Sequence, residues 1–124
     1  MTKRLAAERG FTLVELLIVL MIIGILVAIT MVSYVGYSRK AESATAQANV
    51  HVIVPSVEAY AADNGTYTGM TLLGLKTAYD QSIDPSMYKL TSLTASDYCI
   101  SSAVGGQAWK RTGPGTDIVA GECP

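Results

Sequence analysis

The sequence predicts an α+β protein in which a long N-terminal helix crosses a membrane with its first half and packs with its second half on a small antiparallel β-sheet. Three observations support this fold class. A run of 23 residues without a formal charge extends from Leu16 to Ser38, and helical periodicity continues to Asn64. The residues beyond it hold short strand-like runs and many turn signals. The 124 residues leave room for one small domain after the apolar run.

The apolar run has the length and flanks of a membrane-spanning helix. Twenty or so apolar residues cross about 30 Å of hydrocarbon. Three basic residues lie within positions 1–10, and Arg39 and Lys40 follow the run. The excess of positive charge on the N-terminal side predicts a cytoplasmic N-terminus, with the bulk of the chain outside. Glu15 is unexpected here, because a carboxylate at the centre of a bilayer costs roughly 2.5 to 3.5 kcal/mol on insertion scales.

Two simple interpretations of this segment leave features unexplained. A secretory signal peptide has an apolar core of about 7 to 15 residues followed by a small-x-small cleavage site. Ala44-Thr45-Ala46 offers such a site, but it follows an overlong core and two basic residues. A plain signal anchor accounts for the length and the flanks, yet it explains neither Glu15 nor Gly10.

The composition points away from catalysis and nucleic-acid binding. The formal net charge is −1, and the chain after residues 1–10 carries six basic and nine acidic side chains. A mildly acidic module is a poor ligand for nucleic acid. The sequence offers no catalytic constellation, phosphate loop or metal cluster, so we expect no enzymatic activity, no cofactor and no metal. His51, the sole histidine, is interpreted as a surface residue of a helix.

The two cysteines, Cys99 and Cys123, predict one disulfide. A chain with a membrane-targeting segment delivers its bulk to an oxidising compartment, where such a pair forms. The alternative is two buried, reduced thiols. A metal site is disfavoured because His51 is distant from both cysteines in the sequence.

Beyond the membrane segment the helix is predicted to continue with one apolar stripe. Asn64-Gly65 supplies a stop signal, since glycine adopts the left-handed conformation of a helix cap. Pro55 removes a helical hydrogen bond and predicts a bend or break near Val54. The predicted stripe consists of Ala41, Ala44, Ala48, Val50, Ile53, Val54, Val57, Tyr60 and Ala61.

The remainder is predicted to form a small sheet laid on that helix. The run MTLLGLK, residues 70–76, is ambiguous between helix and strand, and residues 78–88 are expected to form a connecting loop with a turn at Asp84-Pro85. Residues 89–104 and 107–113 have strand-like content, and Gly105-Gly106 between them is a hairpin signal. Residues 116–123 are expected to return as a last strand or an extended tail.

The stretch GFTLVELLIVLMIIGILVAI, residues 10–29, resembles the N-terminus of type IV pilins and of their relatives, the pseudopilins of type II secretion and DNA-uptake machines. The resemblance implies a pilin-like fold and a leader that a dedicated membrane peptidase cuts between Gly10 and Phe11. It also implies N-methylation of Phe11. Glu15 stands at the glutamate that the family uses for subunit assembly, and Gly24 matches a common family glycine.

The resemblance also implies how the chain is divided and with what it associates. Residues 1–10 are the cleaved leader, 11–38 the transmembrane and filament-core helix, 39–64 its amphipathic continuation, and 65–124 a globular head with a disulfide-closed C-terminal loop. The implied partners are other copies of the chain, the prepilin peptidase and methylase, the inner-membrane assembly platform with its ATPase motors, minor pilins, and membrane lipid before assembly. The implied localisation is the bacterial cytoplasmic membrane, then an extracellular pilus.

Cleavage at Gly10 gives Glu15 a physical role. It creates a cationic amine on Phe11, with a reference pKa of about 7.7 to 8.0. In the family this amine pairs with the glutamate of a neighbouring subunit. The alternative interpretation is that Glu15 makes its contact within its own helix, because the N-terminus of a helix favours negative charge. Two further hypotheses are kept: a pseudopilin or minor pilin of a secretion or competence machine, and a membrane-anchored binding module that never polymerises.

Overall fold

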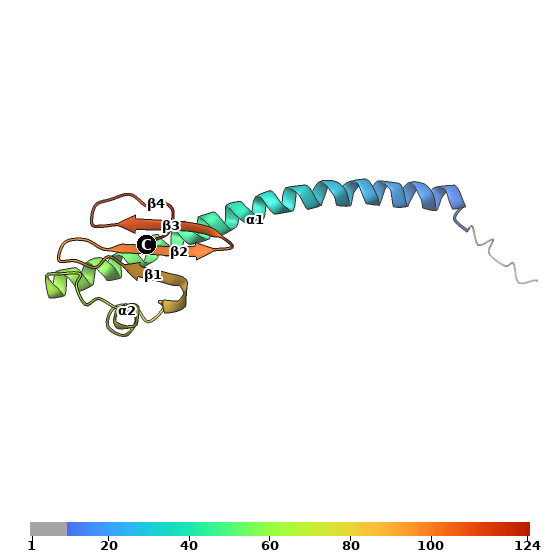
Figure 1. The fold of residues 1–124 in the computed structure, drawn as a ribbon. Coiled ribbons are helices and arrows are strands. Elements are labelled where there is room, and N and C mark those ends of the chain that lie inside the picture. Colours follow the sequence, from blue (N-terminus) through green and yellow to red (C-terminus); the bar gives the residue numbers. More distant parts are fainter. Residues whose placement is uncertain (1–9) are drawn as a thin grey trace, which may run out of the picture. The chain divides into compact units, whose positions relative to one another are not determined.

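The computed structural model describes residues 10–124, so the leader expected at residues 1–10 lies, apart from Gly10, outside the described residues. Contacts divide the chain into two units with the boundary between Tyr37 and Ser38. The C-terminal unit, the head, is an α+β structure in which helix packs on an antiparallel sheet, as expected (Figure 1). In chain order the elements are α1 (Leu13–Asn64), α2 (Leu72–Ala78), the short 3₁₀ helix η1 (Pro85–Met87), β1 (Tyr88–Thr91), β2 (Cys99–Val104), β3 (Gln107–Thr112) and β4 (Val119–Ala120).

Helix α1 ends at the predicted stop. Asn64 is its last residue, and Gly65 follows with a φ of 70°. The Gly65 backbone N–H donates to the Ala61 carbonyl at 2.7 Å. The Asn64 side-chain amide donates to the Tyr60 carbonyl at 2.9 Å. These bonds satisfy carbonyls that every helix leaves without partners at its C-terminal end.

A bend or a break was expected near Val54, and the break does not occur: α1 continues as one helix through Pro55. A proline inside a helix costs about 3 kcal/mol through its missing N–H and its clash with the preceding turn. The residues around it are buried in the core, among them Ile53 and Val57 with no exposed surface. Burying each such aliphatic side chain contributes about 1.5 to 3 kcal/mol. Packing of this turn on the sheet therefore outweighs the local preference.

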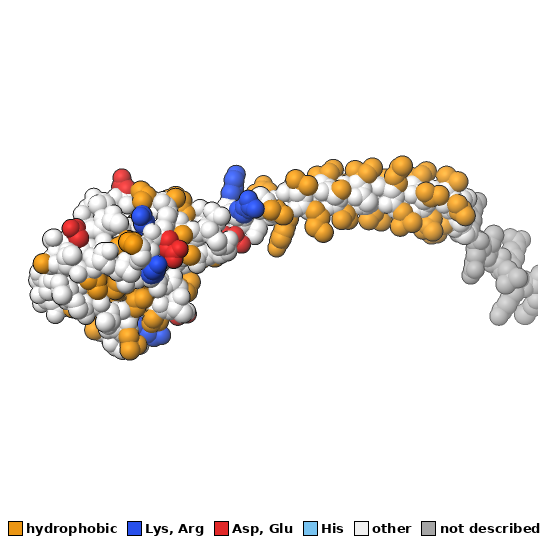
Figure 2. All heavy atoms as spheres, viewed as in Figure 1, with side chains coloured by type: hydrophobic (Ala, Val, Ile, Leu, Met, Phe, Trp, Pro, Cys, Tyr) orange, Lys and Arg blue, Asp and Glu red, His pale blue; other side chains and the backbone are white. Residues whose placement is uncertain are grey.

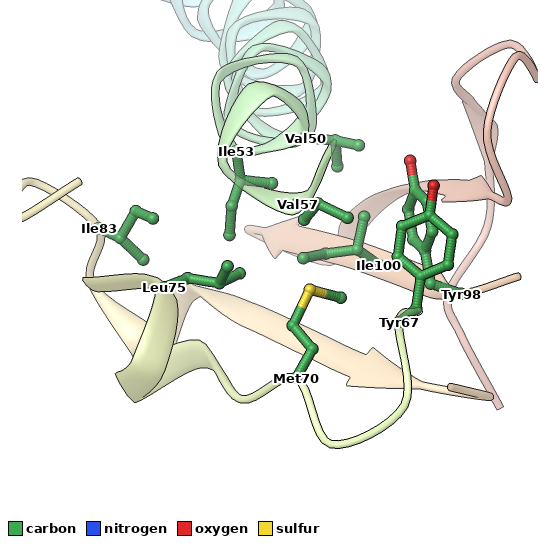
Figure 3. Close-up of a cluster of buried hydrophobic side chains, with 9 residues drawn as sticks. All are labelled: Val50, Ile53, Val57, Tyr67, Met70, Leu75, Ile83, Tyr98 and Ile100. Carbon is green, nitrogen blue, oxygen red and sulfur yellow. The ribbon is translucent and has the colours of Figure 1, made fainter. Parts of the chain in front are cut away.

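The helix meets the sheet through one stripe, which is only part of the predicted one. Val50, Ile53 and Val57 are fully buried, as expected, and Ala46, which was not expected, joins them. Around this stripe the core gathers residues from α2, the loops and β2 (Figure 3). The core cluster is Val50, Ile53, Val57, Tyr67, Met70, Leu75, Ile83, Tyr98 and Ile100.

Ala41, Ala44 and Ala48 are exposed, and their assignment to the core was wrong. At about 100° per residue these alanines lie on the opposite side of α1 from Ala46 and Val50. The predicted stripe therefore merged two opposite apolar faces of one helix. Spacing alone reveals that a helix has apolar faces, whereas the sheet decides which of them is covered.

The sheet has four strands within the described residues, in the order β1-β2-β3-β4, and every neighbouring pair is antiparallel. The hairpin at Gly105-Gly106 is confirmed, with φ angles of 55° and 82° that suit glycine at both positions. Residues 89–104, predicted as one strand-like run, form two strands separated by a loop. The ambiguous run resolves as α2, whose first turn is capped by the Thr71 hydroxyl. The predicted loop holds η1, capped by the Asp84 carboxylate.

The predicted disulfide is confirmed and fastens the C-terminal tail to the sheet. Cys99 on β2 is bonded to Cys123, with 5.8 Å between the two Cα atoms. The Cys123 backbone N–H donates to the Ser101 hydroxyl at 3.2 Å. The short strand β4 pairs with β3 just before this point. Both cysteines are buried.

Polar groups also join α1 to the sheet. Trp109 donates its indole N–H to the Ser43 hydroxyl at 2.8 Å. Near the other end of the interface, the Glu58 carboxylate accepts the hydroxyls of Tyr67 at 2.9 Å and Tyr98 at 3.2 Å. Burial raises the pKa of both tyrosine hydroxyls above the ordinary value of 10.0, and the neighbouring Glu58 carboxylate acts in the same direction. Each hydroxyl therefore stays a proton donor over the whole neutral range.

Candidate assembly site at the start of helix α1

The peptide bond expected to be cut precedes the helix, and both residues that it joins are exposed. Gly10 is exposed and lies outside regular structure. Apart from its chain neighbours, no heavy atom of the described residues lies within 4 Å of the position that a Cβ of Gly10 would occupy. Phe11 follows with 89% of its surface exposed. Within residues 10–124, both residues that flank this bond are therefore exposed.

The first turn of α1 is closed by a reciprocal pair of residues. The Thr12 hydroxyl accepts the Glu15 backbone N–H at 3.1 Å. In return, the Glu15 Oε2 accepts the Thr12 backbone N–H at 3.1 Å and its hydroxyl at 3.3 Å. This arrangement is a capping box, in which Thr-x-x-Glu satisfies two backbone donors that a helix start leaves free.

The capping box assigns a role to Thr12 that the sequence analysis did not give it. The signal was available, because threonine followed three residues later by glutamate before an apolar run is the capping-box pattern. The box also explains how Glu15 is tolerated at the start of an apolar helix. Its Oε2 is held by Thr12 and lies at the helix end where negative charge is favoured. Within residues 10–124 the Oε1 atom accepts no hydrogen bond, so half of the carboxylate remains available.

The helix after this box is apolar on every side. From Leu13 to Tyr37 all its large hydrophobic side chains are exposed, most of them by half or more. Figure 2 shows these orange side chains along the length of the segment, with white backbone atoms visible between them. Its one threonine and one serine donate hydrogen bonds within the helix, Thr30 to the Val27 carbonyl at 2.8 Å and Ser33 to the Ile29 carbonyl at 3.2 Å. The described residues contain one helix long and apolar enough to cross a membrane, and it is this one.

The structure brings together some of the predicted assembly residues and not others. Glu15 meets Thr12, whereas Phe11 is almost fully exposed. Gly24 lies in the middle of the apolar segment, with open space at the position of a missing Cβ. Among residues 10–124 no group of three or more His, Cys, Asp and Glu side chains is placed to hold a metal ion.

Comparison with known proteins gives this arrangement a context. Residues 5–31 match the family model of the prokaryotic N-terminal methylation motif. The chain is 33% identical over 113 residues to the type IV wide pilus major component PilA4 of Thermus thermophilus, covering 86% of this chain and 82% of that protein. It is 33% identical over 110 residues to fimbrial protein Q of Moraxella bovis, covering 89% of this chain and 66% of that protein. The type II secretion system core protein G of Dickeya chrysanthemi is 30% identical over 60 residues, which cover 48% of this chain and 39% of that protein.

The apolar helix is exposed, begins with a capped carboxylate, and continues in sequence into the helix of a small head that a disulfide closes. These features define a subunit whose N-terminal segment is suited to a surrounding of lipid or of other helices. The chain belongs to the type IV pilin family.

Proposed function

We propose that this chain is the structural subunit of a type IV pilus filament, made as a precursor and polymerised through its apolar helix. The precursor is cut between Gly10 and Phe11, and the new N-terminus is methylated on Phe11. Residues 11–38 hold the subunit in the membrane and then form the filament core. Residues 39–64 continue the helix into the head, and residues 65–124 complete the outer surface.

The observation that carries this proposal is the exposure of the apolar half of α1. Hydrophobic burial contributes about 25 cal/mol per Å² of apolar surface removed from water, so a helix that is apolar all round is stable only inside lipid or among other helices. Membrane and filament are the two environments that meet this requirement in turn. Association among helices leaving lipid then depends on close packing and polar contacts. Gly24 permits such close approach, since it carries no side chain.

Glu15 supplies the polar contact in this proposal. Its Oε2 stays in the capping box with Thr12, and its Oε1 accepts the Phe11 amine of a neighbouring subunit. Two unit charges about 4 Å apart attract by about 4 kcal/mol at an effective dielectric constant of 20. A subunit out of axial register leaves both charges unpaired in an apolar surrounding, which is strongly destabilising. The pair therefore selects the register of each incoming subunit.

The proposal fixes the partners and the location of the chain. It requires a peptidase and methylase acting at Gly10 and Phe11, an assembly platform in the inner membrane with its ATPase motors, and minor pilins. The subunit spans the cytoplasmic membrane with its N-terminus inside before assembly, and is extracellular afterwards. It acts as a structural element and not as an enzyme, in keeping with its family.

A second candidate function is that of a pseudopilin or minor pilin in a secretion or competence machine. The similarity to type II secretion core protein G favours it over part of the chain. Abundance separates the two functions. A principal pilin is the main protein of filaments sheared from cells, whereas a pseudopilin or minor pilin is scarce there.

The test is the N-terminal residue of the protein in sheared filaments, determined by sequencing and mass spectrometry. We expect a chain that begins at methylated Phe11 and dominates the filament fraction, and we expect no filaments from cells that lack only this gene. An intact Met1, or a start after Ala46, together with absence from filaments, contradicts the proposal. Such a result favours a membrane-anchored binding module.

A further inference from the structure

Two exposed basic residues stand at one end of the head. Arg39 and Lys40 follow Ser38, the last residue of the charge-free run, and both are exposed on the first turn of α1 that belongs to the head. Figure 2 shows basic side chains at this end of the head. Within residues 10–124 neither forms an ion pair, because the recorded pair joins Lys89 and Glu122. Both cations are therefore available to an anion from outside the described chain.

The acid nearest to them in the sequence, Glu42, has its own contacts. The Ser38 hydroxyl donates to its Oε1 at 3.3 Å. A Cβ on Gly105 would collide with the same carboxylate, so the carboxylate lies directly against the hairpin between β2 and β3. The tip of that hairpin, residues 104–107, carries no charge. Glu42 therefore forms no ion pair with either basic residue, although it follows them by only two and three positions.

The positive end does not follow from the overall charge of the head. Nine acidic side chains lie after residue 10, and only Glu15 of these precedes the head, so residues 38–124 contain eight acidic and six basic side chains. Basic residues on the outer side of a membrane segment also run against the rule that places most positive charge inside, in the topology that we propose. Two adjacent cations at this point therefore indicate a role at the outer membrane surface.

Their level on the helix matches the headgroups of the outer lipid layer. At a rise of 1.5 Å per residue, the 23 residues from Leu16 to Ser38 extend about 35 Å, slightly more than the roughly 30 Å of hydrocarbon. In the proposed membrane-spanning state, Arg39 and Lys40 therefore lie where lipid phosphates lie. A guanidinium matches a phosphate with two parallel hydrogen bonds, and an ammonium adds a compact positive charge.

We infer that Arg39 and Lys40 bind the phosphate groups of anionic phospholipids at the outer surface of the cytoplasmic membrane. A zwitterionic lipid carries its own ammonium group beside the phosphate, so a lipid with net negative charge is the better partner. This inference rests on the proposed function. It adds the class of lipid that the subunit holds before assembly and must release when it enters the filament.

A tryptophan at position 37 reports which lipid lies beside the two cations. Tyr37→Trp is combined with Trp109→Phe, because Trp109 is the sole tryptophan of the chain. The full chain is reconstituted in phosphatidylcholine vesicles that contain brominated phosphatidylglycerol or brominated phosphatidylcholine as the quencher. We expect phosphatidylglycerol to bind beside the reporter about fivefold or more tightly than phosphatidylcholine. The basic residues within positions 1–10 lie at the opposite end of the apolar run and do not influence this short-range signal.

Neutral variants test whether the two cations cause this preference. Adding Arg39→Gln with Lys40→Gln should remove it, leaving a binding ratio of about 1. The matched control, Lys76→Gln with Lys110→Gln, makes the same change of net charge on α2 and β3 and should keep the preference. Resistance of the head to trypsin verifies folding. If Trp109→Phe unfolds the head, Trp109 is retained and its signal, measured in the chain with Tyr37, is subtracted.

The outcomes separate the inference from the proposed function. Equal binding of the two lipids beside the reporter, or an equal loss of preference in the control, overturns the inference. Either result leaves the proposed function intact, because the measurement uses single subunits in vesicles and no filament. Quenching by neither lipid means that the apolar run does not enter the membrane, which contradicts the proposed function and the inference together.

Discussion

The two halves of α1 differ in what surrounds them. From Leu13 to Tyr37 no large hydrophobic side chain is buried, whereas from Ser38 to Asn64 one face is buried against the head. The first half is apolar all round and the second carries polar and charged residues between its apolar positions. A helix that is apolar on every side has no preferred face for an intramolecular partner. The comparison indicates that the second half of α1 folds the head, whereas the first half keeps its apolar surface for the filament core that we propose.

Glu15 in the first half of α1 and Glu58 in the second half also differ in how many of their carboxylate oxygens accept hydrogen bonds. Glu58 uses both of its oxygens within the head, accepting the hydroxyls of Tyr67 and Tyr98. Among the described residues, Glu15 accepts hydrogen bonds only at Oε2, in the capping box with Thr12. A buried polar group is stable when all of its hydrogen bonds are made. The acid of the head is complete in the single chain, whereas the acid of the apolar segment has capacity left for a partner.

The largest effect is expected at Glu15. We predict that Glu15→Ala abolishes or severely reduces filament assembly without preventing membrane insertion, because the Phe11 amine of the neighbour loses its partner. Glu15→Gln is the informative control, since glutamine also completes a capping box but carries no charge. Filaments counted by electron microscopy, with subunit levels measured in the membrane fraction, decide the outcome. If Glu15→Gln assembles like the unaltered chain, the residue acts by capping its own helix and the ion pair is refuted.

The next effect concerns the head alone. Replacing both Cys99 and Cys123 by serine should lower the free energy of unfolding of the head by about 3.5 kcal/mol, the chain-entropy value for a loop of this size. The measurement is urea unfolding of the full chain in detergent micelles, followed by Trp109 fluorescence. Membrane insertion should not change, because the apolar half of α1 lies outside the cross-linked loop. An insertion defect would show that the two halves are not independent.

Matched truncations compare the two halves directly. Ile53→Ala should lower the free energy of unfolding of the head by about 3 kcal/mol, since it leaves a cavity in a packed core. Ile18→Ala removes the same atoms from a side chain that is 52% exposed, and should leave head unfolding unchanged. Both variants are measured by the same urea titration. Equal losses at the two positions would contradict the division of α1.

The smallest effect depends on pH. Burial holds the pKa of the Tyr98 hydroxyl above the ordinary value of 10.0. The unfolded chain therefore loses this proton first as the pH rises, so the stability of the head is complete below about pH 10 and falls above it. We predict that the urea midpoint declines above this pH and that Tyr98→Phe declines less steeply. A midpoint that stays constant up to pH 11 would be evidence against the buried hydroxyl.

The helix end at Gly65, the hairpin and the disulfide could be predicted from the sequence, because each depends on residues that act through local geometry or through a unique pair. The capping box at Thr12 and Glu15 was equally local, and its pattern was present in the sequence. Which apolar face of α1 is buried could not be predicted. Ala48 and Val50 each lie three or four residues from other apolar residues of the helix, so spacing does not distinguish them. Val50 is buried and Ala48 is exposed only because the sheet packs on one side of the helix.

The sequence by itself determined that the first half of the helix needs an apolar surrounding, that a charged group begins it, and that the tail is tied to the head by Cys99 and Cys123. These properties follow from composition and from backbone chemistry over a few residues. Only the tertiary structure decided that α1 passes through Pro55 unbroken, that residues 89–104 divide into two strands, and that Ala44 and Ala48 stay exposed. The physical reason is that each of these outcomes depends on contacts between distant segments, whose burial energy exceeds the local preferences that a sequence displays.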